Sequence, residues 1–141
     1  MSSPYNVVLA NGCWDLFHYG HLLHLEAAAE MGGALIVSIT SDRFVNKGPG
    51  RPVYPQEHRA RIVESLRCVD GVIIVDNLIE AMTLIRPDIL VKGQDYKRGL
   101  DQEHQDFCRQ NGIEIRYTET PKYSASQFLD ASRALQLDKR L

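Results

Sequence analysis

This sequence of 141 residues has few cysteines, no long apolar run and no excess of basic charge. Its cysteines, Cys13, Cys68 and Cys108, are odd in number and widely spaced, which argues against a disulfide framework and a zinc ribbon. No run approaches the ~20 apolar residues that a transmembrane helix needs. The N-terminus lacks the charged and apolar regions of a signal peptide. The formal charge of −2 lacks the basic excess of a general nucleic-acid binder. We therefore expect a cytoplasmic protein with no membrane or nucleic-acid partner.

What the sequence does contain is an alternation of apolar runs and helical patterns. The expected strands are residues 5–10, 34–40, 71–75, 88–92 and 113–117, and the expected helices are 21–31, 56–66, 78–85 and 100–111, with a last one from about Ser124. Buried strands separated by helices indicate a parallel sheet that is covered on both faces. The sequence therefore predicts an α/β fold: a Rossmann-like, doubly wound, parallel five-stranded sheet with helices on both faces, in a single domain over residues 1–141.

Polar clusters follow the predicted strands. Ligands of open parallel sheets lie beyond the carboxyl ends of the strands, at the point where the strand order reverses. The first such cluster is NGCWDLFHYGH, residues 11–21. Its Gly12 and Gly20 let the backbone come close to a ligand, and exposed N–H groups ahead of a helix favour an anion. We therefore expect an anion such as a phosphate near this loop.

Three interpretations of the histidines in and beside this cluster compete. His18, His21 and His24 could hold a metal, although at roughly 100° per residue His24 lies ~120° round a helix from His18, which makes a shared ligand sphere awkward. They could be ordinary residues of a helix start. They could also bind a nucleotide, because imidazole donates hydrogen bonds to phosphate oxygens and adds charge when protonated. Spacing alone does not decide among the three.

The longer stretch around the histidines resembles a known motif. The motif is G-x-F-D-x-x-H-x-G-H of the cytidylyltransferase-like nucleotidyltransferases, and the matching residues are Gly12, Cys13, Trp14, Asp15, His18, Gly20 and His21. Trp14 stands where the family has Phe, an exchange that an aromatic packing position accepts. In this family H-x-G-H holds a nucleoside triphosphate, so the resemblance implies a nucleotide site.

Later stretches resemble the same family. The loop and helix NKGPGRPVYPQEHR place Lys47, Arg51 and Arg59 where the family has cations. PDILVKGQDYKRG is similar to the P-D-hydrophobic-L-V-K-G-G-D-Y-K stretch of the heptose-phosphate nucleotidyltransferases, with Gln94 in place of the second glycine. YSASQFL stands where the family has S-T-T ahead of its last helix, and Ala125 replaces the central hydroxyl residue. The resemblance covers nearly the whole chain.

Each of these stretches also has an interpretation without a ligand. The loop cations could be solvated. Lys92 and Asp95 could form a salt bridge at the end of a strand, and Ser124 and Ser126 could cap a helix. Cys13 has no general base assigned to it, and we interpret it as structural.

The resemblance implies transfer of a nucleotidyl group from a nucleoside triphosphate to a phosphorylated small molecule, with release of pyrophosphate. The acceptor phosphate is itself the nucleophile, so the protein has to position the reactants and cancel charge. We expect His18, His21 and Lys47 to be catalytic, with the loop at residues 46–55 closing over the triphosphate. Mg²⁺ should bridge phosphate oxygens and use few protein ligands. Related proteins are often dimers, so a homodimer is one arrangement to test.

The remaining site residues are implied by the same motifs. We expect Asp15, Arg51 and Arg59 on the acceptor side. The residues expected to bind the nucleotide are Gly12, Cys13, Trp14, His18, Gly20, His21, Lys92, Gly93, Asp95, Tyr123, Ser124 and Ser126.

Two stretches favour ATP over CTP. Glycerol-phosphate cytidylyltransferases have an arginine at the base site five residues before S-T-T, where this chain has Glu119. VKGQDYK follows the heptose enzymes, which use ATP. The implied acceptor is thus a sugar 1-phosphate such as D-glycero-D-manno-heptose 1-phosphate. The alternatives are a CTP-dependent cytidylyltransferase for glycerol 3-phosphate or a related alcohol phosphate, and a non-catalytic nucleotide-binding module.

Overall fold

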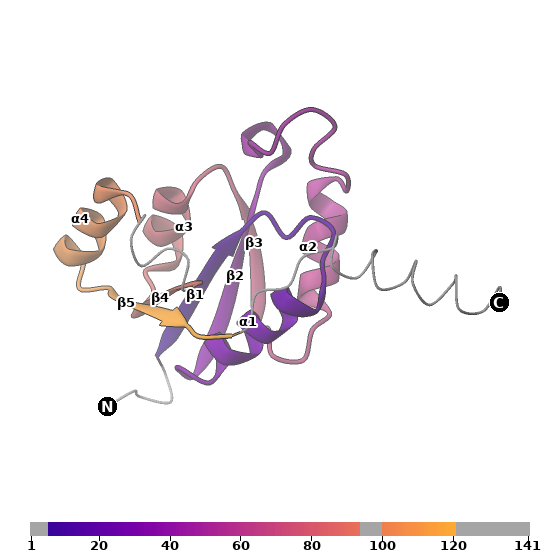
Figure 1. The fold of residues 1–141 in the computed structure, drawn as a ribbon. Helices are drawn as coiled ribbons and strands as arrows, with labels where there is room; N and C mark the ends of the chain where they lie inside the picture. The colour runs from indigo at the N-terminus through magenta and orange to yellow at the C-terminus, as the bar shows by residue number, and fades with distance from the viewer. Residues whose placement is uncertain (1–5, 94–99, 121–141) are drawn as a thin grey trace.

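Five parallel strands form the centre of the computed structural model, which describes residues 6–93 and 100–120 (Figure 1). The strands are β1 (Val7–Gly12), β2 (Ala34–Thr40), β3 (Gly71–Val75), β4 (Ile89–Gly93) and β5 (Glu114–Thr118). They lie in the order β3-β2-β1-β4-β5, and all neighbours are parallel. The predicted α/β fold with a doubly wound parallel sheet is confirmed.

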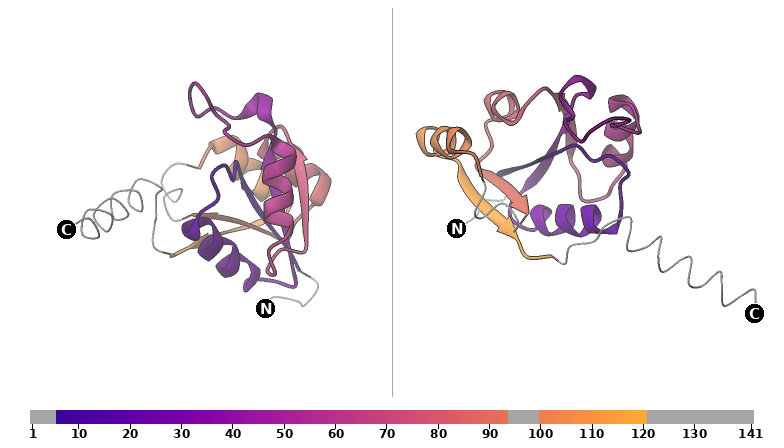
Figure 2. Two further views of the ribbon diagram at one scale, coloured as in Figure 1. Left: turned by 90° about the vertical axis from the view of Figure 1, so that its right-hand side faces the viewer. Right: turned by 45° about the horizontal axis from the view of Figure 1, so that its top comes forward.

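Helices cover both faces of the sheet (Figure 2). Helices α1 (Tyr19–Ala29) and α2 (Gln56–Glu64) pack on one face, and α3 (Leu78–Ile85) and α4 (Gln102–Gln110) pack on the other. A short 3-10 helix, η1 (Asp42–Phe44), follows β2. Neighbouring residues of β1 enter different cores: Val8 lies in the α1–α2 cluster, and Leu9 lies in the α3–α4 cluster. Within the described ranges, no helix has the length and apolar character to cross a membrane.

The strand order reverses at β1, and this reversal fixes where a ligand site can form. β1 pairs with β2 on one side and with β4 on the other, so the chain crosses back over the sheet after β3. The helices that follow β1 and β4 lie on opposite faces of the sheet, and in doubly wound sheets ligands bind at the carboxyl ends of two such strands. The loop that starts at Gly12 and the end of β4 at Gly93 both border this position.

Element ends differ from the sequence prediction where caps and strand pairing decide them. β1 continues to Gly12 because its last two residues pair with β2. α1 begins at Tyr19, earlier than predicted, because His18 caps it. The bounds of β2, β3 and α3 are those predicted, and the other helices and strands lie within two residues of prediction at most ends. The predicted helix from about Ser124 lies outside the described residues.

Candidate active site

The loop after β1 is shaped by Trp14, which folds back over Gly12. Trp14 has a positive φ of 59° and is only 6% exposed, and its Nε1 donates a hydrogen bond to the Ser38 carbonyl oxygen at 3.0 Å. A Cβ atom at Gly12 would lie 2.9 Å from Cε2 of this ring, so glycine leaves the room that the indole needs. Gly12 therefore has a packing role, and its contact with a nucleotide stays a prediction.

His18 and His21 form a capping box at the start of α1. His18 is the N-cap residue, with an extended backbone, and its Nδ1 accepts a hydrogen bond from Gly20 N at 3.1 Å. His18 N in turn donates to His21 Nδ1 at 3.2 Å. Both bonds satisfy backbone N–H groups near the helix start, where intrahelical partners are missing. The helix-start interpretation is thus confirmed, and it leaves the Nε2 atom of each ring for a ligand.

These hydrogen bonds also fix the protons of the two rings. A ring nitrogen that accepts a hydrogen bond from a backbone N–H carries no proton, so each neutral imidazole has its proton on Nε2. The rings stack with their centroids 3.9 Å apart, so two positive charges there would repel each other. Burial, then the charges of His18 and Lys47, lower the pKa of His21 to about 4. Burial and Lys47 also lower the pKa of His18. Both residues are therefore neutral Nε2–H donors at neutral pH.

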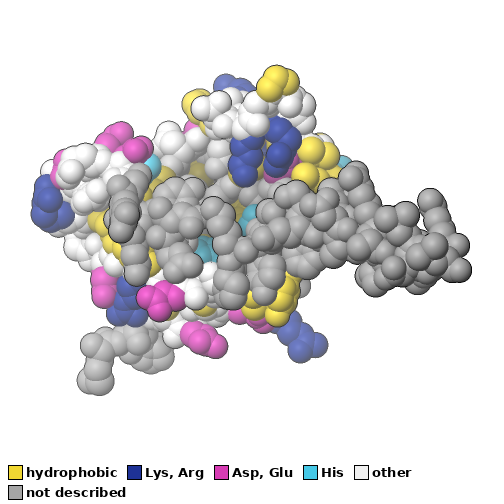
Figure 3. All heavy atoms as spheres, viewed as in Figure 1, with side chains coloured by type: hydrophobic (Ala, Val, Ile, Leu, Met, Phe, Trp, Pro, Cys, Tyr) yellow, Lys and Arg dark blue, Asp and Glu magenta, His cyan; other side chains and the backbone are white. Residues whose placement is uncertain are grey.

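Lys47 supplies the positive charge beside these donors. It lies exposed on the loop before α2, and its positive charge lowers the pKa of both His18 and His21. Among the residues that the structure describes, Lys47 makes no ion pair. Histidine side chains lie in the middle of this face of the molecule, below a group of Lys and Arg side chains (Figure 3). Two neutral donors and one cation are the chemical composition of an anion site.

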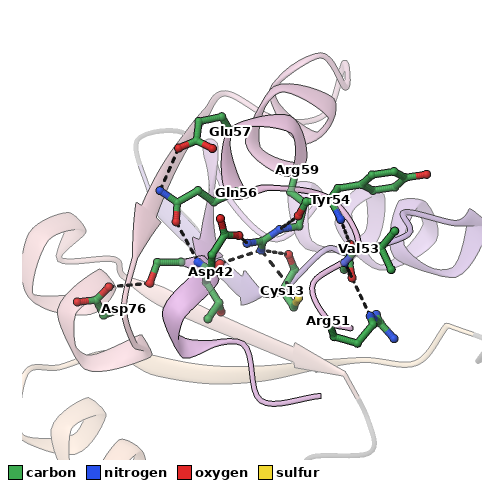
Figure 4. Close-up of polar contacts among 12 residues, drawn as sticks. Cys13, Asp42, Arg51, Val53, Tyr54, Gln56, Glu57, Arg59 and Asp76 are labelled. Carbon is green, nitrogen blue, oxygen red and sulfur yellow. Dashed lines mark hydrogen bonds and ion pairs between the residues drawn. The ribbon is translucent and has the colours of Figure 1, made fainter. Parts of the chain in front are cut away.

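Asp15 anchors the second half of the loop before α2 through Arg51, Val53 and Tyr54, which Figure 4 labels. Its side chain is fully buried, and its carboxylate accepts hydrogen bonds from Arg51 Nε at 2.8 Å, Val53 N at 2.7 Å and Tyr54 N at 3.0 Å. Burial opposes the negative charge, but the three donors outweigh it and lower the pKa of Asp15 to about 2. Residues 46–50 make no hydrogen bond among the described residues. In the structure, Asp15 and Arg51 thus bond to each other and hold the second half of this loop. Their contact with an acceptor stays a prediction.

Arg59 is a buried cation that joins three segments (Figure 4). Its guanidinium donates to the carbonyl oxygens of Cys13 at 2.7 Å, Thr40 at 2.7 Å and Tyr54 at 2.9 Å, and it pairs with Asp42 at 2.7 Å. These bonds tie the first loop, the end of β2 and the loop before α2 together. The side chain of Arg59 is 0% exposed and its bonds lie within the protein, and its contact with an acceptor stays a prediction. The bond to Cys13 agrees with a structural interpretation of that residue.

The end of β4 supplies Lys92 and Gly93. Lys92 is 8% exposed and shares a side of the strand with Leu90, which belongs to the α3–α4 cluster. Burial lowers the pKa of Lys92, although the charge of Asp101 opposes the shift. A contact of Lys92 or Gly93 with the nucleotide stays a prediction. The other expected nucleotide contacts lie outside the described residues: Asp95, Tyr123, Ser124 and Ser126.

Two contacts near the site were missed at the level of sequence. His24 Nδ1 lies 2.7 Å from Thr118 Oγ1, a partner 94 residues away, and Asp42 pairs with Arg59 across 17 residues. Neither separation produces a local pattern, so only the folded chain reveals them. In the ranges 6–93 and 100–120, no group of three His, Cys, Asp or Glu residues could hold a metal.

Known proteins agree with this geometry. The chain matches the family model described as Cytidylyltransferase-like over residues 9–134. The chain belongs to the cytidylyltransferase-like family. Among curated relatives in this family, it is 49% identical over 94 residues to the Bifunctional protein HldE of Gluconobacter oxydans (strain 621H), a match that covers 64% of this chain and 20% of that protein. It is 42% identical over 115 residues to the Bifunctional protein HldE of Azotobacter vinelandii, covering 78% of this chain and 24% of the relative. The chain thus spans about a fifth to a quarter of these relatives.

Solved structures show the same fold. The lipopolysaccharide core biosynthesis protein from Thermoplasma volcanium GSS1 matches with a TM-score of 0.69 and 24% identity, over 84% of this chain and 98% of that one. Pantothenate synthetase from Thermus thermophilus matches with a TM-score of 0.62 and 14% identity, over 86% of this chain and 58% of that one. Family membership and the HldE relatives together show a nucleotidyltransferase-like domain.

Proposed function

We propose that this protein transfers the adenylyl group of ATP to a sugar 1-phosphate, with D-glycero-D-manno-heptose 1-phosphate as the first candidate, and releases pyrophosphate. The observation that carries the proposal is the stacked pair of neutral imidazole donors, His18 and His21, whose pKa values the charge of Lys47 helps to lower. They meet at the carboxyl end of β1, where a doubly wound sheet binds its ligands. A triphosphate is a ligand of matching charge.

The reaction needs positioning more than an activated side chain. An oxygen of the acceptor phosphate attacks the α-phosphorus, the bond to the β-phosphate oxygen breaks, and the electron pair leaves with pyrophosphate. The Nε2–H groups of His18 and His21 donate to phosphate oxygens on which charge increases, and Lys47 neutralises part of the charge of the leaving group. Because the capping box holds both rings before the nucleotide arrives, little reorganisation is needed during the reaction.

We propose Mg²⁺ as an ion that arrives bound to the triphosphate. Mg²⁺ prefers oxygen ligands and commonly binds through substrate phosphates and one or two carboxylates. The described part of the chain gathers no group of three side chains that could hold a metal, and the carboxylate of Asp15 already accepts three hydrogen bonds. When bound, Mg²⁺ neutralises phosphate charge. Its oxygen ligands would then come mainly from the nucleotide.

The choice of ATP and a heptose phosphate is supported by sequence. The relatives at 42–49% identity are HldE, bifunctional proteins that contain a heptose 1-phosphate adenylyltransferase. Glu119 stands where glycerol-phosphate cytidylyltransferases have their base-site arginine. A second candidate is a CTP-dependent cytidylyltransferase for glycerol 3-phosphate or a related alcohol phosphate, because departures from the heptose pattern such as Gln94 and Ala125 can mark a different sugar or base.

Turnover with matched substrates tests the proposal. Pyrophosphate release is measured with ATP, CTP or GTP, each with the heptose 1-phosphate or glycerol 3-phosphate, in the presence of Mg²⁺. We expect ATP with the heptose phosphate to give the highest kcat/KM, because a site that hydrogen-bonds one base leaves polar groups unpaired with another. A preference for CTP with glycerol 3-phosphate would establish the second candidate. Nucleotide binding without turnover in any pair would leave a non-catalytic nucleotide-binding module.

A further inference from the structure

His24 is a largely buried titratable residue that the proposed phosphate contacts do not use. It lies on α1, one turn after His21, and its Nδ1 is 2.7 Å from the hydroxyl oxygen of Thr118. Thr118 is the last residue of β5 and is 3% exposed. This hydrogen bond joins the helix that begins with the phosphate-binding histidines to the edge strand of the sheet. It spans 94 residues of sequence, so it connects parts of the site that no local element holds together.

The ring of His24 also contacts the first loop. It stacks on Trp14 with centroids 6.1 Å apart and 30° between the planes. Trp14 meets His21 edge-on, with centroids 5.5 Å apart and an angle of 74°. A continuous set of contacts therefore runs from Thr118 through His24 and Trp14 to His21. A shift of the His24 ring would change the surface against which the His21 ring is held.

His24 keeps one charge state under working conditions. Burial, together with the charge of Lys92, lowers the pKa of His24 to about 4, so its ring is neutral at neutral pH. A neutral ring and a threonine hydroxyl form a single hydrogen bond in which one donates and the other accepts. This bond is half-buried, and the loss of either partner leaves the other polar group without it.

We propose that His24 and Thr118 are a positioning pair: their hydrogen bond holds the His24 ring against Trp14 and thereby keeps His21 aimed at the triphosphate. The effect on turnover rests on the proposed function. The effect on the Trp14 environment does not, because it depends only on the contacts within the protein.

Substitutions at Thr118 test the pair with little change in shape. Thr118→Val removes the hydroxyl, Thr118→Ser keeps it, and Thr83→Val is the matched control, since the Thr83 hydroxyl bonds to Ile79 O within α3. We expect Thr118→Val to lower kcat about tenfold with KM for the nucleotide changed less than about twofold, as expected for a group that acts in the transition state. Thr118→Ser should restore kcat, and Thr83→Val should leave it unchanged.

Trp14 is the protein's single tryptophan, so its fluorescence provides a measurement that does not depend on catalytic turnover. We expect Thr118→Val and His24→Phe to change its emission spectrum and the NMR shifts of the His21 ring, and Thr118→Ser to leave both near those of the wild-type chain. The double variant should resemble the single variants, because both remove the same bond. If neither signal changes in Thr118→Val, or if kcat falls only in proportion to the folded fraction, the positioning role is wrong. A chain without turnover of any nucleotide, but with these spectral changes, would refute the proposed function and keep the pair.

Discussion

Replacing His18 with asparagine or glutamine separates its two roles, because the two amides place their polar atoms differently. Asparagine has an oxygen near the position of Nδ1, which accepts the hydrogen bond from Gly20 N at 3.1 Å. Glutamine reaches farther and places an N–H donor near the position of Nε2. His18→Asn therefore keeps the helix cap and removes the phosphate donor, whereas His18→Gln does the reverse.

The two contributions differ in size and in the property they change. Loss of an N-cap side chain costs about 1 kcal/mol of folding stability. With a urea dependence of about 2 kcal/mol per M, this lowers the unfolding midpoint by about 0.5 M. Loss of a donor to charge that develops in the transition state lowers turnover by about 10²-fold. We expect His18→Asn to unfold like the wild-type chain but to turn over about 10²-fold more slowly. His18→Gln should be less stable and more active than His18→Asn.

Urea unfolding and pyrophosphate release measure the two effects on the same preparations. His18→Ala and His21→Ala should show both losses together. His104→Asn on α4 is the control, because His104 lies on the other face of the sheet and should affect neither measurement. Normal turnover of His18→Asn would refute the assignment of Nε2–H to phosphate binding. A loss of stability in His18→Asn as large as in His18→Ala would refute the cap.

Three further outcomes concern the anchor, the histidines and the loop. Because the folded pKa of Asp15 (about 2) lies below the usual 3.8, its charge stabilises the fold above pH 3.8, and this contribution is lost as the pH falls toward 2. Asp15→Asn should therefore lower the free energy of unfolding at neutral pH by on the order of 2 kcal/mol and speed amide exchange at Val53; an unchanged urea midpoint would contradict this. Since the pKa values of His21 and His24 fall from 6.5 to about 4 on folding, the unfolded chain binds more protons between these values. The urea midpoint should thus be lower at pH 5 than at pH 7. Equal midpoints at the two pH values would contradict the lowered pKa values of these histidines. The backbone amides of residues 46–50 should gain protection from hydrogen exchange when ATP binds. Equal exchange with and without ATP would exclude closure of this segment over the nucleotide.

The sequence predicted the fold well because each element is determined locally. The run ALIVSIT gave the bounds of β2, and LIEAMTLI followed by Pro87 gave those of α3. The site was predicted in part, through motif residues that stand together along the chain. His18 and His21 stack in the structure, and the charge of Lys47 lowers the pKa of both, while their contacts with a nucleotide stay predictions. Closure of residues 46–55 over a nucleotide stays a prediction, and the structure shows that Asp15 holds Val53 and Tyr54 in the second half of this loop.

The sequence by itself determined the parallel α/β sheet, and it predicted an anion site after the first strand. The periodicity of apolar residues, the signals at helix ends and a run of motif residues are local properties of the sequence. Each can be recognised without knowing which distant residues it contacts. Only the tertiary structure decided which polar groups are buried in bonds that hold the loops of the candidate site together. Arg59 and Asp15 have the charges of substrate ligands, yet both are buried in bonds to distant segments. Charge is a property of the residue, but the partner of a charge depends on which segments the fold brings within about 3 Å.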